Sequence, residues 1–400
     1  MERIRLTKNP SVLLWLLVLL IALIAACSAP PTTAEDPATT EAPAAGDTSP
    51  TETSESAPEE ITRAETIEEV YAALEGLEGE ERDARLLELA RAEEDTEFLL
   101  YFSVNEGIEW IEGFEEETGL VIDFFQSSQN NVLERALQEH EAGFREGADV
   151  ILLGTPELVA MENEGMFVDL HTPYSDAILP DLVDDQQIGV YLSTTGPAWN
   201  TSVERPADWV SLLESAPNLV IEASDWDYFA TLVLDYMVPE LGMTEEEAID
   251  LWEQAARRAA GASGHTFSVQ MAISGEYDVS VWSHITRVQE FEQEGAPIAW
   301  QPAIEPHVNR PNGVAIHHFT DRPATSLLLV DWFLTGAQEI MLTQNTVPAN
   351  TEVGGEHPAL QVDLLSIRGF HTPDFDSDLW QQIWEDRVVN NFTEVLEEEE

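Results

Sequence analysis

The sequence has very little positive charge and almost no cysteine. Lys8 is the only lysine, and 17 lysine and arginine residues stand against 77 aspartate and glutamate residues among 400, which gives a net charge of −60 at pH 7. Nucleic-acid binding rests on basic contacts to phosphate, so this composition argues against it. Cys27 is the single cysteine, which excludes an internal disulfide. A chain this acidic repels itself strongly in dilute salt, and we interpret its charge as adaptation to a saline habitat rather than as a clue to ligand charge.

Several motifs of catalysis and nucleotide binding are also missing. The sequence contains no serine in a glycine elbow, no zinc-binding helix motif, no phosphate loop and no repeat of 20–50 residues. With 77 acids, carboxylate pairs are unavoidable and do not by themselves support a glycosidase. We therefore predict that the protein is not an enzyme. A secreted hydrolase is the competing class, and a surface adhesion module would need β-rich repeats.

The N-terminal residues indicate export. A basic start precedes an apolar segment at residues 11–26, which is short for a membrane span and typical of a signal sequence. Cys27 follows two alanines, and this pattern resembles a bacterial lipobox, in which the cysteine receives lipid after cleavage. We expect a lipoprotein signal peptide over 1–27, a disordered acidic linker rich in Pro and Thr over 28–63, and a lipid anchor at Cys27 on the outer face of the cytoplasmic membrane. An uncleaved anchor would also place the remainder outside the cell.

Residues 98–156 organise the globular part of the chain. Apolar runs at 98–102, 120–125 and 148–154 alternate with helical patterns, which predicts parallel strands in a sheet covered on both faces. Each run ends in small polar residues, and open α/β sheets bind ligands beyond the carboxyl ends of their strands. These loops lack the glycine fingerprint of a nucleotide site. We expect them to form one wall of a cleft, with polar groups that suit a neutral or anionic solute.

A second α/β block follows, after which the chain returns to the first. Strands expected at 219–222 and 278–282 alternate with helices, and residues 310–312 are expected to precede a strand at 313–316. Such a chain builds two lobes joined by a hinge, with the ligand between them. The expected parts are a helical lead-in at 64–96, a first lobe from 97–200 with 303–345, and a second lobe from 201–302 with 346–390.

Short motifs spread over roughly residues 97–350 resemble, in this order, the family 1 extracellular solute-binding proteins of ABC transporters, in their iron-type branch. The motifs are Leu100-Tyr101-Phe102-Ser103, Ala148-Asp149-Val150-Ile151-Leu152-Leu153-Gly154, Trp199-Asn200-Thr201, Gly264-His265-Thr266, Arg310-Pro311-Asn312-Gly313-Val314-Ala315 and Val347-Pro348-Ala349. The resemblance implies an α/β, two-lobe periplasmic-binding-protein fold of type II (Venus-flytrap). It also implies a monomer without cofactor or catalytic residues that delivers a captured solute to a membrane permease.

The chain departs from the ferric-binding members of that family. They carry adjacent tyrosines after the strand that corresponds to residues 278–282, where this chain has Trp282-Ser283-His284. Phenolate suits ferric iron, whereas imidazole prefers borderline metals such as zinc or copper. A small organic solute is therefore expected, with a ferric or other metal ion as the alternative. The sequence leaves the identity of the solute open.

Ten residues at strand ends are the predicted ligand contacts. Hydroxyl and amide groups can hydrogen-bond a solute, aromatic rings can stack on it, and carboxylates can bind an amine. Helix caps, turns and core packing are the competing interpretations. The ten are Ser103, Asn105, Ser127, Ser128 and Thr155 on the first wall, and Asp225, Trp226, Tyr228, Trp282 and His284 on the second.

The remaining histidines carry weaker expectations. His265 stands at a helix start and is expected to be a surface residue. His317 and His318 are neighbours on an expected strand, so their side chains should point to opposite faces. We therefore predict that they do not share a metal ion, and we predict no metal site.

Overall fold

The computed structural model describes residues 63–93, 97–145, 147–369, 372 and 375–396. The expected signal peptide, the expected lipidation site at Cys27 and nearly all of the expected linker lie outside these residues. Within the described ranges, no helix has the length and apolar character needed to cross a membrane.

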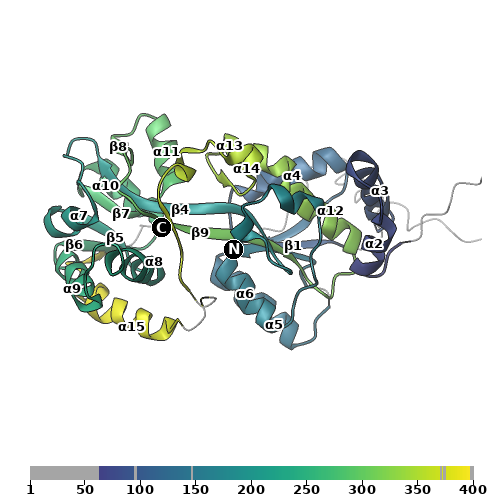
Figure 1. Cartoon of the computed structure of the whole chain (residues 1–400), viewed down its shortest axis with the longest axis horizontal. Coiled ribbons are helices and arrows are strands. Elements are labelled where there is room, and N and C mark those ends of the chain that lie inside the picture. The colour runs from purple at the N-terminus through teal and green to yellow at the C-terminus, as the bar shows by residue number, and fades with distance from the viewer. Residues whose placement is uncertain (1–62, 94–96, 146, 370–371, 373–374, 397–400) are drawn as a thin grey trace, which may run out of the picture. The chain divides into compact units, whose positions relative to one another are not determined.

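The described residues form one sheet of twelve strands with helices around it (Figure 1). The strands are β1 (Leu99–Phe102), β2 (Asp123–Gln126), β3 (Val150–Gly154), β4 (Ile188–Asn200), β5 (Leu219–Glu222), β6 (Ala259–Ala262), β7 (Val279–His284), β8 (Ile298–Ala299), β9 (His307–Ile316), β10 (Val347–Pro348), β11 (Leu364–Ser366) and β12 (Val395–Leu396). Their order is β12-β6-β5-β7-β4-β9-β3-β1-β2, while β8 and β10 pair with β4, and β11 pairs with β9.

The α-helices surround both ends of this sheet. They are α2 (Ile67–Leu74), α3 (Gly79–Arg91), α4 (Gly107–Thr118), α5 (Gln129–Glu141), α6 (Thr155–Asn163), α7 (Trp209–Ser215), α8 (Trp226–Leu232), α9 (Glu245–Ala256), α10 (His265–Ser274), α11 (Ile285–Gln293), α12 (Pro323–Leu334), α13 (Gly336–Thr343), α14 (Thr351–Gly354) and α15 (Ser377–Arg387).

The parallel strands expected at the start of the globular part are confirmed. β1 pairs in parallel with β2 on one side and with β3 on the other, and helices α4 and α5 connect them. β2 begins later than expected, at Asp123, so residues 120–122 precede the strand. Leu120 and Ile122 are nevertheless buried in the core. The carboxyl ends of β1, β2 and β3 therefore lie at one edge, as the argument for a cleft requires.

Two long antiparallel strands, β4 and β9, run between the two halves of the sheet (Figure 1). The first part of β4 pairs with β9, and its last part pairs with β7 and β8. The sequence pattern predicts two strands in this stretch, at 188–192 and at 196–201. The structure corrects this, because a register shift between Gly196 and Ala198 accommodates the proline inside one continuous strand.

The stretch around Arg310 also differs from the prediction. Residues 310–312 were expected to precede a strand, yet they lie in the middle of β9. β11 pairs with residues 307–309 and β3 pairs with residues 312–316, so Arg310 and Pro311 pair only with β4. A proline without an N–H is tolerated where a strand has one free edge. Arg310 therefore lies in β9 between the part that pairs with β11 and the part that pairs with β3.

Each half has its own hydrophobic core, which makes two lobes on a shared sheet. The first core joins the lead-in helices α2 and α3 to β1, β3, α4 and α12. The second core is rich in tryptophan and joins β5, β7, α7, α8, α9 and α15. Because β4 and β9 belong to both lobes, the residue boundaries given above for the lobes stay a prediction.

A buried ion pair fastens the lead-in helices to the first lobe. Arg82 Nη1 on α3 lies 2.7 Å from Asp331 Oδ2 on α12, and Asp331 also accepts a hydrogen bond from Thr172 Oγ1 at 2.6 Å. Burial raises the pKa of Asp331 to about 6, although Arg82 opposes the shift. The pair therefore needs both partners to remain stable in the interior.

Candidate functional site

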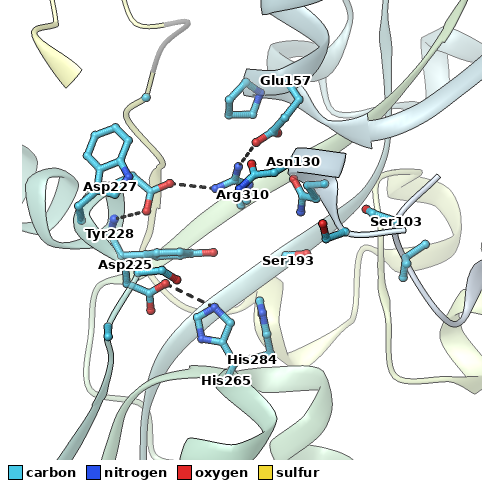
Figure 2. Close-up of a pocket in the computed structure, with 18 of the residues that line it drawn as sticks. Ser103, Asn130, Glu157, Ser193, Asp225, Asp227, Tyr228, His265, His284 and Arg310 are labelled. Carbon is cyan, nitrogen blue, oxygen red and sulfur yellow. Dashed lines mark hydrogen bonds and ion pairs between the residues drawn. The ribbon is translucent and has the colours of Figure 1, made fainter. Parts of the chain in front are cut away.

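A cavity of about 1210 Å³ lies at the strand ends of both lobes. Its walls come from the loop after β1, the starts of α5, α6 and α10, the loop between β5 and α8, the end of β7, the middle of β4 and β9, and helix α15. Both lobes thus contribute to one pocket, as Figure 2 shows for the side chains around Arg310 and Asp225.

Seven of the ten predicted contacts line this pocket: Ser103, Asn105, Ser128, Asp225, Trp226, Tyr228 and His284. Some of them also have local structural roles. Ser128 is the N-cap of α5 and accepts a hydrogen bond from the Asn131 backbone N–H at 3.3 Å. Asn105 Oδ1 accepts from Gln126 Nε2 at 2.8 Å. For these two residues, the capping and turn interpretation accounts for part of the side chain's bonding.

Ser127, Thr155 and Trp282 are outside the pocket lining. Ser127 Oγ accepts a hydrogen bond from Asn131 Nδ2, and Thr155 begins α6. Trp282 is fully buried and stacks on Trp252 with ring centroids 5.7 Å apart. Trp282 and His284 are two residues apart on β7 and so share a face of the strand, yet only His284 lines the pocket. The tryptophan cluster buries Trp282, whereas His284 is the last residue of the strand.

Arg310 connects the two walls of the pocket. Its Nη2 lies 2.6 Å from Glu157 Oε1 at the start of α6, and its Nη1 lies 2.9 Å from Asp227 Oδ2 on α8 (Figure 2). Burial raises the pKa of both carboxyl groups, and the guanidinium opposes this. Burial alone would lower the pKa of Arg310, but the two carboxylates outweigh it and raise that pKa. The cation therefore neutralises acids from both lobes.

Gly154 makes room for this arrangement. A Cβ atom at this position would lie 2.3 Å from Glu157 Oε2, 2.6 Å from Gln129 Oε1 and 3.3 Å from Arg310 Nε. These same three polar atoms are buried and have no hydrogen-bond partner. They converge on the space that a side chain would fill. A larger residue would push the Glu157 carboxylate away from Arg310.

Asp225, His265 and His284 form a second polar group, on the other lobe. Asp225 Oδ1 lies 3.5 Å from His265 Nε2 (Figure 2), and the rings of His265 and His284 meet edge to face with centroids 4.1 Å apart. His265 Nδ1 is 3.1 Å from the Trp282 carbonyl, so Nδ1 carries the proton and Nε2 faces the carboxyl group. Contrary to the sequence expectation, His265 is a pocket residue.

Burial controls the ionisation of this group. It raises the pKa of Asp225 well above the usual carboxyl range, helped by Glu222 and Asp227. It lowers the pKa of His265, and it lowers that of His284 well below the usual range, with further repulsion from His265. Asp225 is 3% exposed and occupies the N-cap of α8 without making a capping hydrogen bond. Its Oδ2 atom has no partner. A carboxyl group in this position can take a hydrogen-bond donor from a ligand.

Sequence reasoning missed several lining residues. Arg310 was missed because the start of β9 was misplaced, and Glu157 was missed because acids are so numerous in the chain. Asp227 belongs to the predicted contact loop after β5 but was not among the ten residues. Helix α15 packs Trp380 and Trp384 into the second core, and its polar side contributes Asp378, Gln381, Gln382 and Glu385 to the lining. Trp384 Nε1 donates a hydrogen bond to the Ala223 carbonyl at 2.7 Å, which attaches the helix to the loop that carries Asp225.

Comparison with known proteins identifies the family and the fold. The profile of the family described as bacterial extracellular solute-binding protein matches residues 109–363. Similar solved structures include iron-bound HitA from Pseudomonas aeruginosa (15% identity, TM-score 0.57, 73% of this chain and 99% of that chain). A second is AfuA from Actinobacillus pleuropneumoniae with fructose-6-phosphate bound (17% identity, TM-score 0.57, 73% of this chain and 98% of that chain). A third is the spermidine/putrescine substrate-binding protein PotD from Streptococcus pneumoniae (13% identity, TM-score 0.58, 74% of this chain and 98% of that chain). No curated protein sequence matches the chain.

Proposed function

The chain belongs to the family of bacterial extracellular solute-binding proteins, and on this basis we propose that it is the substrate-binding component of an ABC importer whose solute is a small organic molecule with an amino group. The family consists of binding proteins rather than enzymes, and it acts outside the cell. The proposed anchor is lipid on Cys27, the proposed partner is a membrane permease, and the proposed working form is a monomer. The lobes would close on the solute by bending at β4 and β9.

One observation carries the choice of an amine: the unpartnered Oδ2 of buried Asp225. A buried polar atom without a partner destabilises the free protein, and a ligand that supplies a donor removes that penalty. An ammonium group supplies three donors and a charge. The aromatic rings of Trp226 and Tyr228 lie on the same wall and suit the apolar part of such a solute. This choice replaces the neutral or anionic solute that the loops of the first wall had suggested.

The arginines of the pocket support this choice. Arg310 is held by Glu157 and Asp227, and Arg287 is held by Glu106 and Glu290. Each cation already faces two carboxylates, so neither is available as an unpaired charge for an anionic solute. The fold itself does not select the ligand, because the similar structures named above include an iron-bound protein, one with fructose-6-phosphate bound and a spermidine/putrescine substrate-binding protein.

Ferric iron is less suited to this pocket. Tyr191 and Tyr228 line it, but burial raises the pKa of both phenols and so disfavours the phenolate that ferric iron prefers. Among the described residues, the group of three close metal-ligating side chains, His140, His317 and His318, lies outside this pocket.

The test is a calorimetric titration of the purified protein with diamines, amino acids and amino sugars, beside neutral sugars, phosphate esters and ferric citrate. We expect an amine to bind and Asp225→Asn to weaken that binding about 10- to 100-fold, since a hydrogen bond to a charged group contributes roughly 1.5–3 kcal/mol. Asp123→Asn, at an exposed position at the start of β2, is the matched control and should leave the affinity unchanged.

The pH dependence gives a second readout. The ammonium pairs with ionised Asp225, whose pKa in the free protein is raised, so binding must release a proton. Affinity should therefore increase as the pH rises from about 4 towards the pKa of the amine near 10. Binding of a neutral sugar or an anion alone would overturn the amine proposal and leave the family assignment intact.

A further inference from the structure

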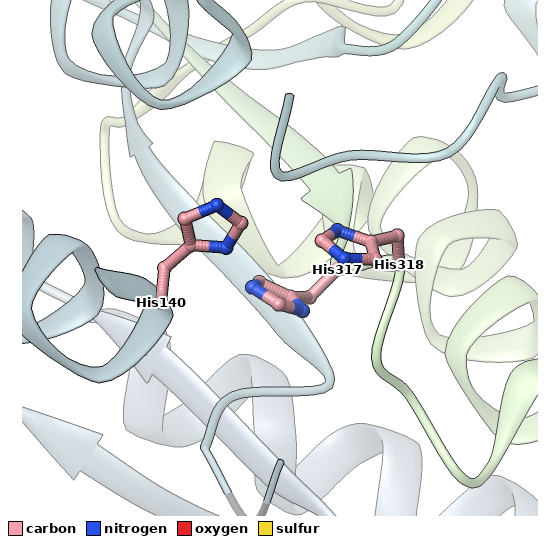
Figure 3. A group of neighbouring side chains, drawn as sticks. All are labelled: His140, His317 and His318. Carbon is pink, nitrogen blue, oxygen red and sulfur yellow. The ribbon is translucent and has the colours of Figure 1, made fainter. Parts of the chain in front are cut away.

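Three histidines gather in the first lobe, away from the solute pocket (Figure 3). His140 lies on the last turn of α5, while His317 and His318 follow the end of β9. Each offers a ring nitrogen, and the three nitrogens all lie within 4.8 Å of one another. None of the three lines the pocket described above.

His317 and His318 do not point to opposite faces, as would be expected if both continued a strand. β9 ends at Ile316, and His318 already belongs to a turn. The two rings therefore lie on the same side, nearly parallel at 17°, with centroids 4.9 Å apart. His317 and His318 therefore lie close together, and His140 approaches them from helix α5.

The hydrogen bonds at His318 prepare it as a ligand. Its Nδ1 is 2.9 Å from the Met166 carbonyl, so Nδ1–H donates to that oxygen and the lone pair of Nε2 is free. A histidine that binds a metal usually has its other ring nitrogen bonded to a carbonyl or carboxylate in this way. His318 is exposed, so an ion can reach it from solvent.

His140 contributes an unsatisfied atom. Its Nδ1 is buried and has no hydrogen-bond partner. The His140 and His317 side chains also line a cavity of about 10 Å³, which is near the volume needed by one water-sized particle. A small vacant space beside a buried, unpartnered imidazole nitrogen is the arrangement that a bound ion would satisfy.

A hydrogen bond at His317 is expected to weaken the binding of a metal ion. Its Nδ1 accepts a hydrogen bond from the Phe319 backbone N–H at 3.0 Å, so coordination must break this bond or move the ring proton. The nitrogens must also approach one another, since ligands of a tetrahedral zinc ion at 2.0–2.1 Å lie roughly 3.3 Å apart. Rotation of His140 and exposed His318 can provide this movement. These two requirements favour a reversible site over a structural one.

We propose that His140, His317 and His318 bind one borderline divalent metal ion, of the zinc, nickel, cobalt or copper kind. Imidazole nitrogens suit these ions, whereas calcium and magnesium require oxygen ligands. The nearby carboxylate of Glu139 is bonded to Arg135 and Tyr101. The site therefore consists of three imidazoles with a remaining coordination position for water, and it joins α5 to the end of β9.

The experiment titrates the full chain, purified free of metal, with Zn²⁺ and Ni²⁺ by calorimetry and with Co²⁺ by visible absorption. We expect one ion to bind per chain, and His140→Ala and His318→Ala each to weaken binding at least tenfold. His171→Ala, an exposed histidine elsewhere in the first lobe, is the matched control and should bind as the parent does. Circular dichroism checks that each variant is folded.

A His265→Ala/His284→Ala double variant separates this site from the solute pocket and should retain the ion. Loss of the ion in that variant, with full binding in His140→Ala, would place the metal in the pocket and overturn the proposal. Failure of all three ions to bind the parent chain would also overturn it, and the three rings would then form an aromatic packing cluster with neighbouring Phe319.

Discussion

Replacing Arg310 with methionine should strongly destabilise the protein, because it leaves two buried carboxylates without their cation. Arg310 bonds Glu157 at 2.6 Å and Asp227 at 2.9 Å, and all three side chains are at most 17% exposed. Removing one partner of a buried ion pair costs about 3–5 kcal/mol. We therefore expect the free energy of unfolding at pH 7 to fall by this amount, as measured by urea unfolding followed by tryptophan fluorescence.

The pH dependence identifies the cause. In the Arg310→Met variant, burial acts on the two carboxyl groups without opposition, so their pKa values in the folded state stand above those in the unfolded chain. The folded variant then binds more protons than the unfolded chain, and its stability should rise as the pH falls from 7 towards 5. Adding Glu157→Gln and Asp227→Asn should restore most of the lost stability at pH 7.

Arg287→Met is the matched control for this experiment. Arg287 also lines the pocket and bonds two carboxylates, Glu106 at 2.8 Å and Glu290 at 2.5 Å, but it is 34% exposed. Pairs with such access to water contribute about 0–1 kcal/mol. Equal losses in the two variants, or a loss in Arg310→Met that does not change with pH, would refute the reasoning.

Two further predictions concern the lead-in helices and the net charge. Arg82→Leu should lower the free energy of unfolding by about 3–5 kcal/mol at pH 8. The loss should be smaller below pH 6, where Asp331 takes up a proton. Arg85→Leu is the control: it removes an exposed pair with Glu88 and should change the free energy of unfolding by less than about 1 kcal/mol. Scanning calorimetry should show a melting temperature that rises with sodium chloride, because a net charge of −60 needs screening, and a melting temperature that is insensitive to salt would remove the saline-habitat interpretation.

The strands were the part of the fold that the sequence predicted best. Parallel strands buried on both faces are continuous apolar runs, so residues 98–102 and 148–154 could be identified as β1 and β3 without a structure. Their order in the chain, together with polar residues at their ends, was enough to predict a cleft between two lobes. Residues 310–312 were placed before a strand although they lie within β9, since proline is rare inside strands. β4 was divided in two because the polar residues 193–195 interrupt its apolar pattern.

The chemistry of the pocket was less predictable. With 77 acids, nothing in the sequence distinguishes Glu157 from the rest, and nothing in it pairs Asp227 with Arg310. Their importance follows from distance to Arg310, which depends on the pairing of β9 with β4. Asp225 was named from its place after a strand, but its unpartnered oxygen and its contact with His265 emerge only when β5, β7 and α10 come together. Position in the chain can be read from the sequence, whereas desolvation cannot.

Because Asp225 is desolvated, the rate at which the proposed solute dissociates should depend little on the overall charge of the protein. Dissolved salt screens the interaction between exposed charges that lie farther apart than the Debye length, which is about 10 Å at 0.1 M and much shorter at 1 M. Salt screens buried pairs much less. Asp225 is buried, so its contact with an ammonium group should persist in concentrated salt while the attraction of the acidic surface disappears. We therefore expect the amine's association rate to fall steeply between 0.1 and 1 M sodium chloride, and its dissociation rate to change little. Stopped-flow fluorescence measures both rates. A dissociation rate that increased in parallel with the loss of association would mean that the surface field, and not Asp225, holds the solute.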